Sequence, residues 1–148
     1  MPSGMSLIVK TVTRLVTGFI VLFGVNIVLY GHLTPGGGFA GGVILAAGLI
    51  LVLLAFGKEQ TLKIVSHGMA VAWDCSGAFA FLAIAGLGYL AGGFFLNFLA
   101  PGEPYRLTSA GTMPLINAAI GAKVAGGLFG VFLALAIFRP GRHREDKS

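Results

Sequence analysis

The sequence is poor in charged residues and in cysteine, and each shortage excludes a class of protein. Charged side chains make up 10% of its 148 residues, whereas hydrophobic side chains make up 56%. Because a soluble domain carries about 25% charged residues, a soluble globular protein is excluded and an integral membrane protein is expected. The single cysteine, Cys75, excludes an internal disulfide and any zinc or iron–sulfur site built from several cysteines.

Four long apolar blocks account for this composition. They are residues 7–30, 39–56, 64–99 and 114–138. Each is near or above the roughly 20 residues that a helix needs to cross a bilayer. The blocks contain runs that are apolar at every position, which favours helices over the alternating strands of a membrane barrel. We therefore expect an all-α integral membrane protein with four transmembrane helices, of which the third is long enough to tilt, kink or continue beyond the membrane.

Basic residues are distributed unequally between the two ends of these four helices. The end that holds both termini has eight of the ten: Lys10, Arg14, Lys58, Lys63, Arg139, Arg142, Arg144 and Lys147. The other end has Arg106, and Lys123 lies inside the fourth block. Because Lys and Arg are enriched in cytoplasmic segments, we expect both termini in the cytoplasm, with residues 139–148 as a basic tail. The net charge of +5 therefore indicates orientation in the bilayer rather than binding to nucleic acid.

Two charged residues lie inside the apolar blocks, Asp74 in the third and Lys123 in the fourth. A charge at the centre of a membrane helix costs about 2.5–3.5 kcal/mol on insertion scales, so such residues usually pair or face water. The two blocks are consecutive and antiparallel, and the long lysine side chain can shorten the distance between them. We predict either an ion pair that merely neutralises two charges or a titratable element of an ion or proton path.

Two histidines are further candidates for such a path. His67 precedes Asp74 by seven residues and so lies on a similar helix face, and His32 lies in the first connection. Each histidine either relays protons near neutral pH or is an interfacial side chain with satisfied hydrogen bonds. No two histidines have metal-ligand spacing, and no nucleophile has a recognisable base. We therefore expect no catalytic residue, metal site or bound cofactor in this chain.

Glycine is abundant, with 24 residues, and many of them lie inside the apolar blocks. Small residues let membrane helices approach one another closely, as in the small-x-x-x-small pair of Gly126 and Gly130. This close packing serves either the four helices of the chain itself or the docking of the chain onto other membrane subunits.

The first connection has an unusual concentration of glycine. Its notable residues are Gly31, His32, Pro35, Gly36, Gly37, Gly38, Phe39, Gly41 and Gly42. A glycine-rich turn before a helix can bind an anion through free N–H groups, but the lysine of a phosphate-binding P-loop is absent. We therefore favour a tight turn that another backbone approaches closely over a phosphate site.

This segment, Gly-His-Leu-Thr-Pro-Gly-Gly-Gly-Phe-Ala-Gly-Gly, resembles a signature of the B subunits of Mrp-type (Mnh-type) Na⁺/H⁺ antiporters. The length, the four spans and the basic ends are similar to that family as well. The resemblance implies a non-enzymatic accessory subunit that assembles with other membrane subunits in the cell membrane of a prokaryote. A similar subunit occurs in membrane-bound hydrogenase-type complexes, where a redox arm drives ion pumping.

The last block departs from the antiporter pattern. Antiporter B subunits tend to have an acidic residue after a Pro-Leu pair there, whereas Pro114-Leu115 is followed by Asn117 and then by Lys123. In this respect the chain is more similar to the hydrogenase-type version, so the parent complex is predicted as either an antiporter or a redox-driven pump. The alternatives are a small independent homo-oligomeric ion channel or transporter and, from His67 and Asp74 alone, an enzyme that acts on lipid.

Overall fold

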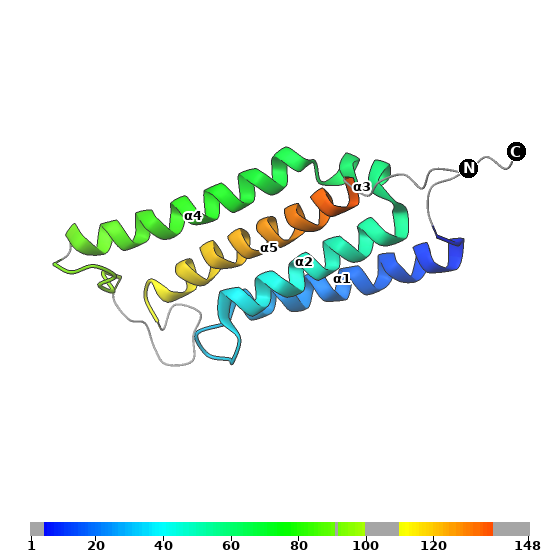
Figure 1. The fold of residues 1–148 in the computed structure, drawn as a ribbon. Helices are drawn as coiled ribbons and strands as arrows, with labels where there is room; N and C mark the ends of the chain where they lie inside the picture. The colour runs from blue at the N-terminus through cyan, green and yellow to red at the C-terminus, as the bar shows by residue number, and fades with distance from the viewer. Residues whose placement is uncertain (1–4, 91, 100–109, 138–148) are drawn as a thin grey trace, which may run out of the picture.

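The computed structural model describes residues 5–90, 92–99 and 110–137, and the regular structure within these ranges is helical. The helices are α1 (Leu7–Leu29), α2 (Gly37–Phe56), α3 (Lys58–Ile64), α4 (His67–Leu90) and α5 (Met113–Ile137). All except the short α3 are long and apolar enough to cross a membrane (Figure 1). The prediction of an all-α chain with four candidate spans is therefore confirmed, whereas Arg106 and the basic tail 139–148 lie outside the described residues.

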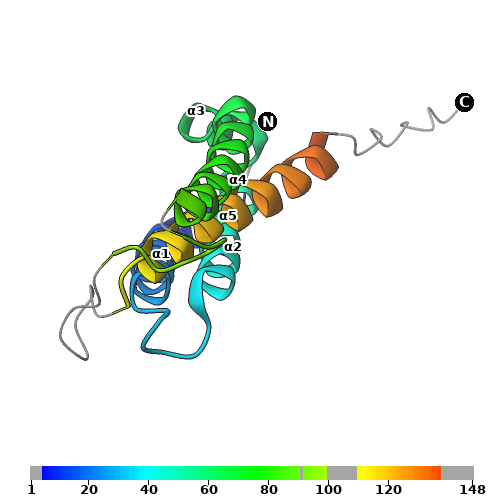
Figure 2. The same ribbon diagram turned by 90° about the vertical axis from the view of Figure 1, so that its left-hand side faces the viewer.

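The four long helices pack side by side in the spatial order α1, α2, α5, α4. The contacts of α1 are mainly with α2, those of α2 extend to α5, and α4 packs along α5. Seen from the side, α5 runs obliquely to its neighbours (Figure 2). The outer helices α1 and α4 therefore keep broad faces that no other described helix covers. Large apolar side chains such as Phe19 and Phe79 project from these faces, as expected for contact with lipid or another subunit.

Helix α4 is shorter than the apolar block 64–99, which we expected to tilt, to kink or to continue beyond the membrane. Its N-terminus is set by the Ser66 hydroxyl, which accepts a 3.2 Å hydrogen bond from the Met69 N–H and so caps the first turn. The helix ends at Leu90, and Gly92 shortly beyond it has a φ of +114°, which a helix cannot contain. The expected span is therefore corrected to a helix of 24 residues, followed by an irregular segment.

Asn97, in this irregular segment, is hydrogen-bonded to the residues just before α5. Its Oδ1 accepts bonds from the Thr112 N–H at 2.9 Å and the Thr112 hydroxyl at 3.1 Å, and its Nδ2 donates to the Ala110 carbonyl at 3.2 Å. These three bonds bring the two described ends of the α4–α5 connection together and fix where α5 begins.

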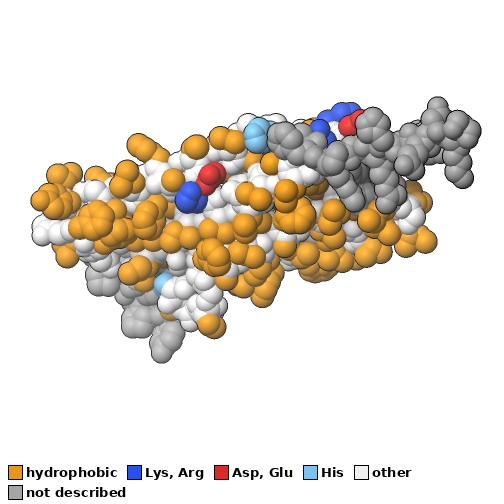
Figure 3. Space-filling view, in the orientation of Figure 1, with side chains coloured by type: hydrophobic (Ala, Val, Ile, Leu, Met, Phe, Trp, Pro, Cys, Tyr) orange, Lys and Arg blue, Asp and Glu red, His pale blue; other side chains and the backbone are white. Residues whose placement is uncertain are grey.

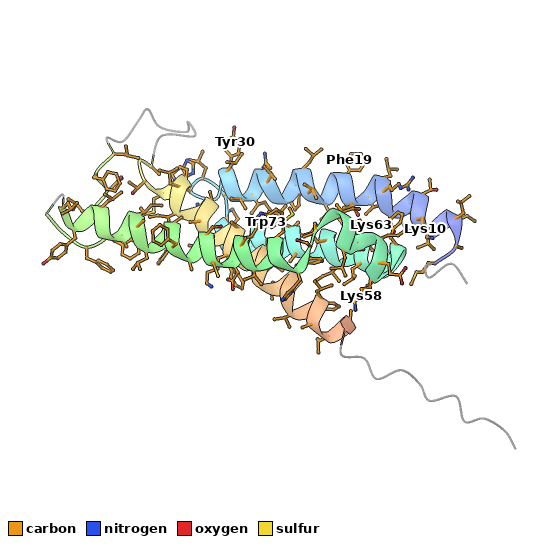
Figure 4. The ribbon with its side chains drawn as sticks, turned by 90° about the horizontal axis from the view of Figure 1, so that it is seen from above. Lys10, Phe19, Tyr30, Lys58, Lys63 and Trp73 are labelled. Carbon is orange, nitrogen blue, oxygen red and sulfur yellow. The ribbon has the colours of Figure 1, made fainter. Side chains whose placement is uncertain are left out.

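The best-buried apolar cluster lies at the end of the molecule that holds α3. Phe129 and Leu133 of α5 have no exposed surface there and pack with Leu53, Val65 and Ala70. The start of α1 and the end of α5 lie at this same end, opposite the α1–α2 turn. Lys10, Lys58 and Lys63 also gather there (Figure 4). This arrangement agrees with an even number of crossings, while a cytoplasmic location for this end is an expectation from the charge distribution.

Candidate functional site

Asp74 of α4 and Lys123 of α5 form an ion pair. The Lys123 Nζ donates a hydrogen bond of 2.8 Å to Asp74 Oδ1. At about 1.5 Å per residue, Lys123 is roughly 15 Å from the start of α5 and Asp74 roughly 10 Å from the start of α4. Both residues therefore lie within the candidate spans and well away from the helix ends. The two charges that the sequence places inside apolar blocks thus meet in the structure.

Two glycines bring the helices together around this pair. Gly77 lies one turn after Asp74 on α4, and a Cβ on it would come within 2.7 Å of the backbone nitrogen of Lys123. Gly126 lies one turn after Lys123 on α5, and a Cβ on it would come within 2.8 Å of the Asp74 nitrogen. Each charged residue thus packs its backbone against the glycine of the opposite helix. This reciprocal contact brings the lysine side chain within hydrogen-bonding distance of the carboxylate.

The chain by itself does not enclose the ion pair. The side chain of Lys123 is 50% exposed and that of Asp74 is 40% exposed. A space-filling view shows a basic side chain against an acidic one on a face that is otherwise mainly hydrophobic (Figure 3). Charges in contact with hydrocarbon are costly even when paired. We therefore expect water or another protein surface, rather than lipid, next to the exposed side of the pair.

The structure does not bring either candidate histidine to the ion pair. His67 is the exposed first residue of α4, about 10 Å along the helix from Asp74. His32 is half-buried in the turn between α1 and α2, at the end opposite α3. Any proton transfer between a histidine and the pair would need intervening water or residues of another chain. Within the described ranges, no group of three or more His, Cys, Asp or Glu residues is arranged to hold a metal ion.

The glycine-rich connection forms a sharp turn that packs against α5. Gly36 and Gly37 have φ values of +130° and +64°, which favour glycine because it lacks a Cβ. Just after them, the Gly38 N–H donates a 3.3 Å hydrogen bond to Asn117 Oδ1. The Asn117 side chain thus occupies the N-terminus of α2, the position where an anion would otherwise bind. The geometry supports the close-approach interpretation of this motif over a phosphate site.

The other glycines fall into two groups. Gly42 packs against α5, because a Cβ there would come within 2.8 Å of the Gly121 carbonyl, and Gly24 packs against Leu45 and Gly41. In contrast, a Cβ on Gly18, Gly86 or Gly130 would have nothing within 4 Å. Glycine therefore serves helix packing inside the chain at the first group of positions. The second group leaves smooth helix surface available to lipid or to other subunits.

Comparison with known proteins adds a family and three relatives. The family model described as "Domain related to MnhB subunit of Na+/H+ antiporter" matches residues 8–130. Uncharacterized protein MJ1307 of Methanocaldococcus jannaschii is 34% identical over 128 residues, which are 82% of this chain and 48% of that protein. The protein named "Putative antiporter subunit mnhB2" of Staphylococcus saprophyticus is 35% identical over 75 residues, 51% of this chain and 53% of that protein.

A solved structure is similar over most of the chain. It is a chain of the membrane-bound sulfane sulfur reductase, an archaeal respiratory membrane complex, with a TM-score of 0.74 and 33% identity. The match covers 87% of this chain and 57% of that chain. This chain therefore spans about half the length of the relatives that it matches.

Proposed function

The chain belongs to the family of domains related to the MnhB subunit of Na⁺/H⁺ antiporters, and from this membership we propose that it is an accessory subunit of a cation- and proton-translocating complex. Its family and its four long apolar helices make it a multi-pass membrane protein. Two kinds of parent complex fit, a Mrp-type Na⁺/H⁺ antiporter and a redox-driven ion pump of the membrane-bound hydrogenase type. In this proposal the subunit is non-catalytic, binds no cofactor and resides in the cell membrane of a prokaryote.

The observation that carries the proposal is the half-exposed ion pair of Asp74 and Lys123. A chain surrounded only by lipid would hold these two charges against hydrocarbon, which is unfavourable. A neighbouring subunit, or a water-filled path along the boundary with that subunit, would keep the two charges out of contact with hydrocarbon. The position of α4 at the edge of the four-helix arrangement leaves room for such a neighbour.

We further propose that Lys123 and Asp74 take part in the movement of Na⁺ or H⁺ through the complex. A paired lysine and aspartate can exchange a proton or release one another when a cation approaches, which a pair of apolar side chains cannot do. His67 and His32 are more distant contributors, each at an opposite end of the membrane-spanning region. They act in this proposal as proton donors or acceptors near the two surfaces.

The matched relatives include both an antiporter subunit and a chain of a respiratory complex, so they support both proposed parent complexes. A relative named as an antiporter subunit and a similar chain within a respiratory complex each match this chain at more than 30% identity. Asn117, where antiporter B subunits tend to have an acidic residue, favours the redox-driven alternative. The neighbouring subunits of the complex will distinguish the two.

Co-purification from the native membrane tests the proposal directly. A tagged chain extracted in mild detergent should bring antiporter-like membrane subunits with it, and mass spectrometry should identify them. Additional subunits with redox cofactors would indicate the pump, and their absence would indicate the antiporter. A chain that runs as a stable monomer and is active alone would contradict an accessory role.

The independent channel or transporter is tested with the chain by itself. Purified chain is reconstituted into liposomes, and the flux of sodium and of protons is measured with ion-sensitive dyes. An accessory subunit should leave both fluxes at the level of empty liposomes. A flux that depends on this chain alone would support the homo-oligomeric alternative instead.

A further inference from the structure

A hollow at the basic end of the molecule lies between α1, α2 and α3. Its volume is about 510 Å³, which is in the range of small-molecule sites. Two cationic side chains line it from different helices, Arg14 of α1 and Lys63 of α3. The other residues of its lining are Thr17, Val52, Phe56, Gln60 and Ile64. The hollow therefore combines a positively charged part with an apolar wall.

Neither cation of this hollow has an acidic partner within the described ranges. Among the residues that the structure describes, no carboxylate lies within 4 Å of Arg14 or Lys63, although Glu59 lies one turn before Lys63 on α3. The Arg14 guanidinium instead lies 5.2 Å from the centre of the Phe56 ring, against the apolar wall. Two like charges that face one partly enclosed space repel each other, and an anion between them would relieve that repulsion.

Thr17 contributes an independent sign of a missing ligand. Its hydroxyl oxygen is buried and has no hydrogen-bond partner, not even the carbonyl one turn earlier in its own helix. Buried hydroxyls in proteins are nearly always hydrogen-bonded, because an unpaired one loses its hydrogen bonds to water and gains no hydrogen bond within the protein. Thr17 lines the same hollow as the two cations. Because the oxygen itself is buried, it would meet a ligand in the hollow only after rotation of the Thr17 side chain. A ligand with oxygen atoms would then satisfy all three groups at once.

We propose that this hollow binds the phosphate group of an anionic phospholipid. Arg14 and Lys63 hold the phosphate, the Thr17 hydroxyl donates to one of its oxygens, and the acyl chains run along Val52 and Phe56. Basic pockets between membrane helices recognise anionic headgroups in this way. The hollow lies beside α3 and the end of α2 at Phe56, whereas Thr17 lies near the middle of α1, so the hollow extends from the depth of headgroups into the apolar part of the span. This inference goes beyond the proposed function and holds for either parent complex.

Native mass spectrometry of the intact complex tests the proposal. The complex is purified in mild detergent and mixed in turn with phosphatidylglycerol, phosphatidylcholine and inorganic phosphate. We expect retention of phosphatidylglycerol and not of the zwitterionic lipid. The double variant Arg14→Gln/Lys63→Gln should weaken this retention about thirtyfold, because two charges near a headgroup contribute about 2 kcal/mol together.

A matched control separates the site from general surface charge. Lys10→Gln/Lys58→Gln also removes one positive charge from α1 and one from α3, but neither residue lines the hollow. Its retention of phosphatidylglycerol should equal that of the unchanged complex. Equal retention by both double variants would overturn the proposal, because the lipid would then respond to net charge alone.

Two further results would also overturn it. Retention of inorganic phosphate in place of the lipid would assign the hollow to a free anion. Loss of another subunit from Arg14→Gln/Lys63→Gln, with the lipid count unchanged, would assign it to a carboxylate of that subunit. If this double variant does not assemble, Thr17→Val decides, because it alters neither charge nor shape. It should weaken retention about fivefold, and unchanged retention would contradict the proposal.

Discussion

Gly77 of α4 packs directly against Lys123 of α5, so closely that a Cβ on the glycine would lie 2.7 Å from the backbone nitrogen of Lys123. Gly126 makes the equivalent contact with Asp74, the ion-pair partner of that lysine. Each glycine lies three residues after the charged residue of its own helix. This close approach of α4 to α5 and the ion pair are therefore parts of one structural unit, and a change in the helix contact should affect the ion pair.

Gly77→Ala should destabilise the protein by about 1–3 kcal/mol. The added methyl group would overlap the α5 backbone, which cannot move aside as a flexible side chain could. Thermal unfolding in mild detergent should show a lower midpoint temperature. The control is Gly86→Ala in the same helix, where a Cβ meets nothing within 4 Å and the higher helix propensity of alanine should keep or raise stability. Equal losses in the two variants would contradict a special role for the Gly77 contact.

Asp74→Asn and Lys123→Met should each slow ion-coupled transport by the complex at least about tenfold, equivalent to about 1.4 kcal/mol in the barrier. Each single variant leaves one charge without its partner in a membrane span. Assembly of the complex should persist, because the helix contact at Gly77 and Gly126 is unchanged. Flux in vesicles and co-purified subunits are measured in parallel, with Lys58→Met, an exposed lysine of α3, as the control.

The double variant Asp74→Asn/Lys123→Met distinguishes a path from a purely structural pair. Replacing both charges by neutral side chains is often harmless to stability, so the complex should assemble normally. Transport should stay low, because no titratable pair remains. Transport that returned to the normal rate in the double variant would show that the ion pair only neutralises two charges.

The sequence allows the ion pair to be predicted but not the geometry that forms it. Asp74 and Lys123 stand out because charges inside apolar blocks are rare, and consecutive helices are antiparallel neighbours. The register of Gly77 and Gly126 depends on how each helix is rotated about its axis. Helices α4 and α5 are apolar on all sides, so no hydrophobic stripe in the sequence indicates which face packs.

Asn117→Ala should lower stability by about 1 kcal/mol, with a decrease of roughly 2–4 °C in the unfolding midpoint. The change removes the Oδ1 that accepts the Gly38 N–H at the start of α2. Asn117→Asp keeps an acceptor oxygen and adds a negative charge at a helix N-terminus, so it should be as stable as the unchanged protein. Asn26→Ala, at an exposed asparagine of α1, is the control and should have little effect. A similar loss in Asn26→Ala would argue against this cap.

The glycine-rich turn between α1 and α2 was also predicted only in part from the sequence. Its glycines predict positive φ angles and close approach of a backbone, and both are found at Gly36 to Gly38. The partner that approaches is Asn117, which is 79 residues away. A contact over that separation has no local signal. The limits of α4 were missed for a different reason, since the Ser66 cap and Gly92 lie inside one continuous apolar block.

The basic residues predict the orientation of the chain in the membrane, and single cysteines can check this prediction. In a Cys75→Ser background, Thr34→Cys places a thiol in the α1–α2 turn and Glu59→Cys places one on α3, at the opposite end. Both positions are exposed in the structure. Because Lys10, Arg14, Lys58 and Lys63 lie at or near the α3 end, we expect this end in the cytoplasm. An impermeant maleimide should then label Thr34→Cys in intact cells and Glu59→Cys only after permeabilisation.

Two controls make this labelling pattern decisive. Detergent-solubilised membranes should label both variants, which shows that both thiols are reactive. Phe79→Cys, on the exposed apolar face of α4, should stay unlabelled in membranes because lipid or a neighbouring subunit excludes the charged reagent. The reverse labelling pattern would invert the orientation, and labelling of both positions from one side would contradict the arrangement of four crossings. If the orientation is inverted, the positive residues of the α3 end would be explained by a partner or ligand rather than by their placement in the cytoplasm.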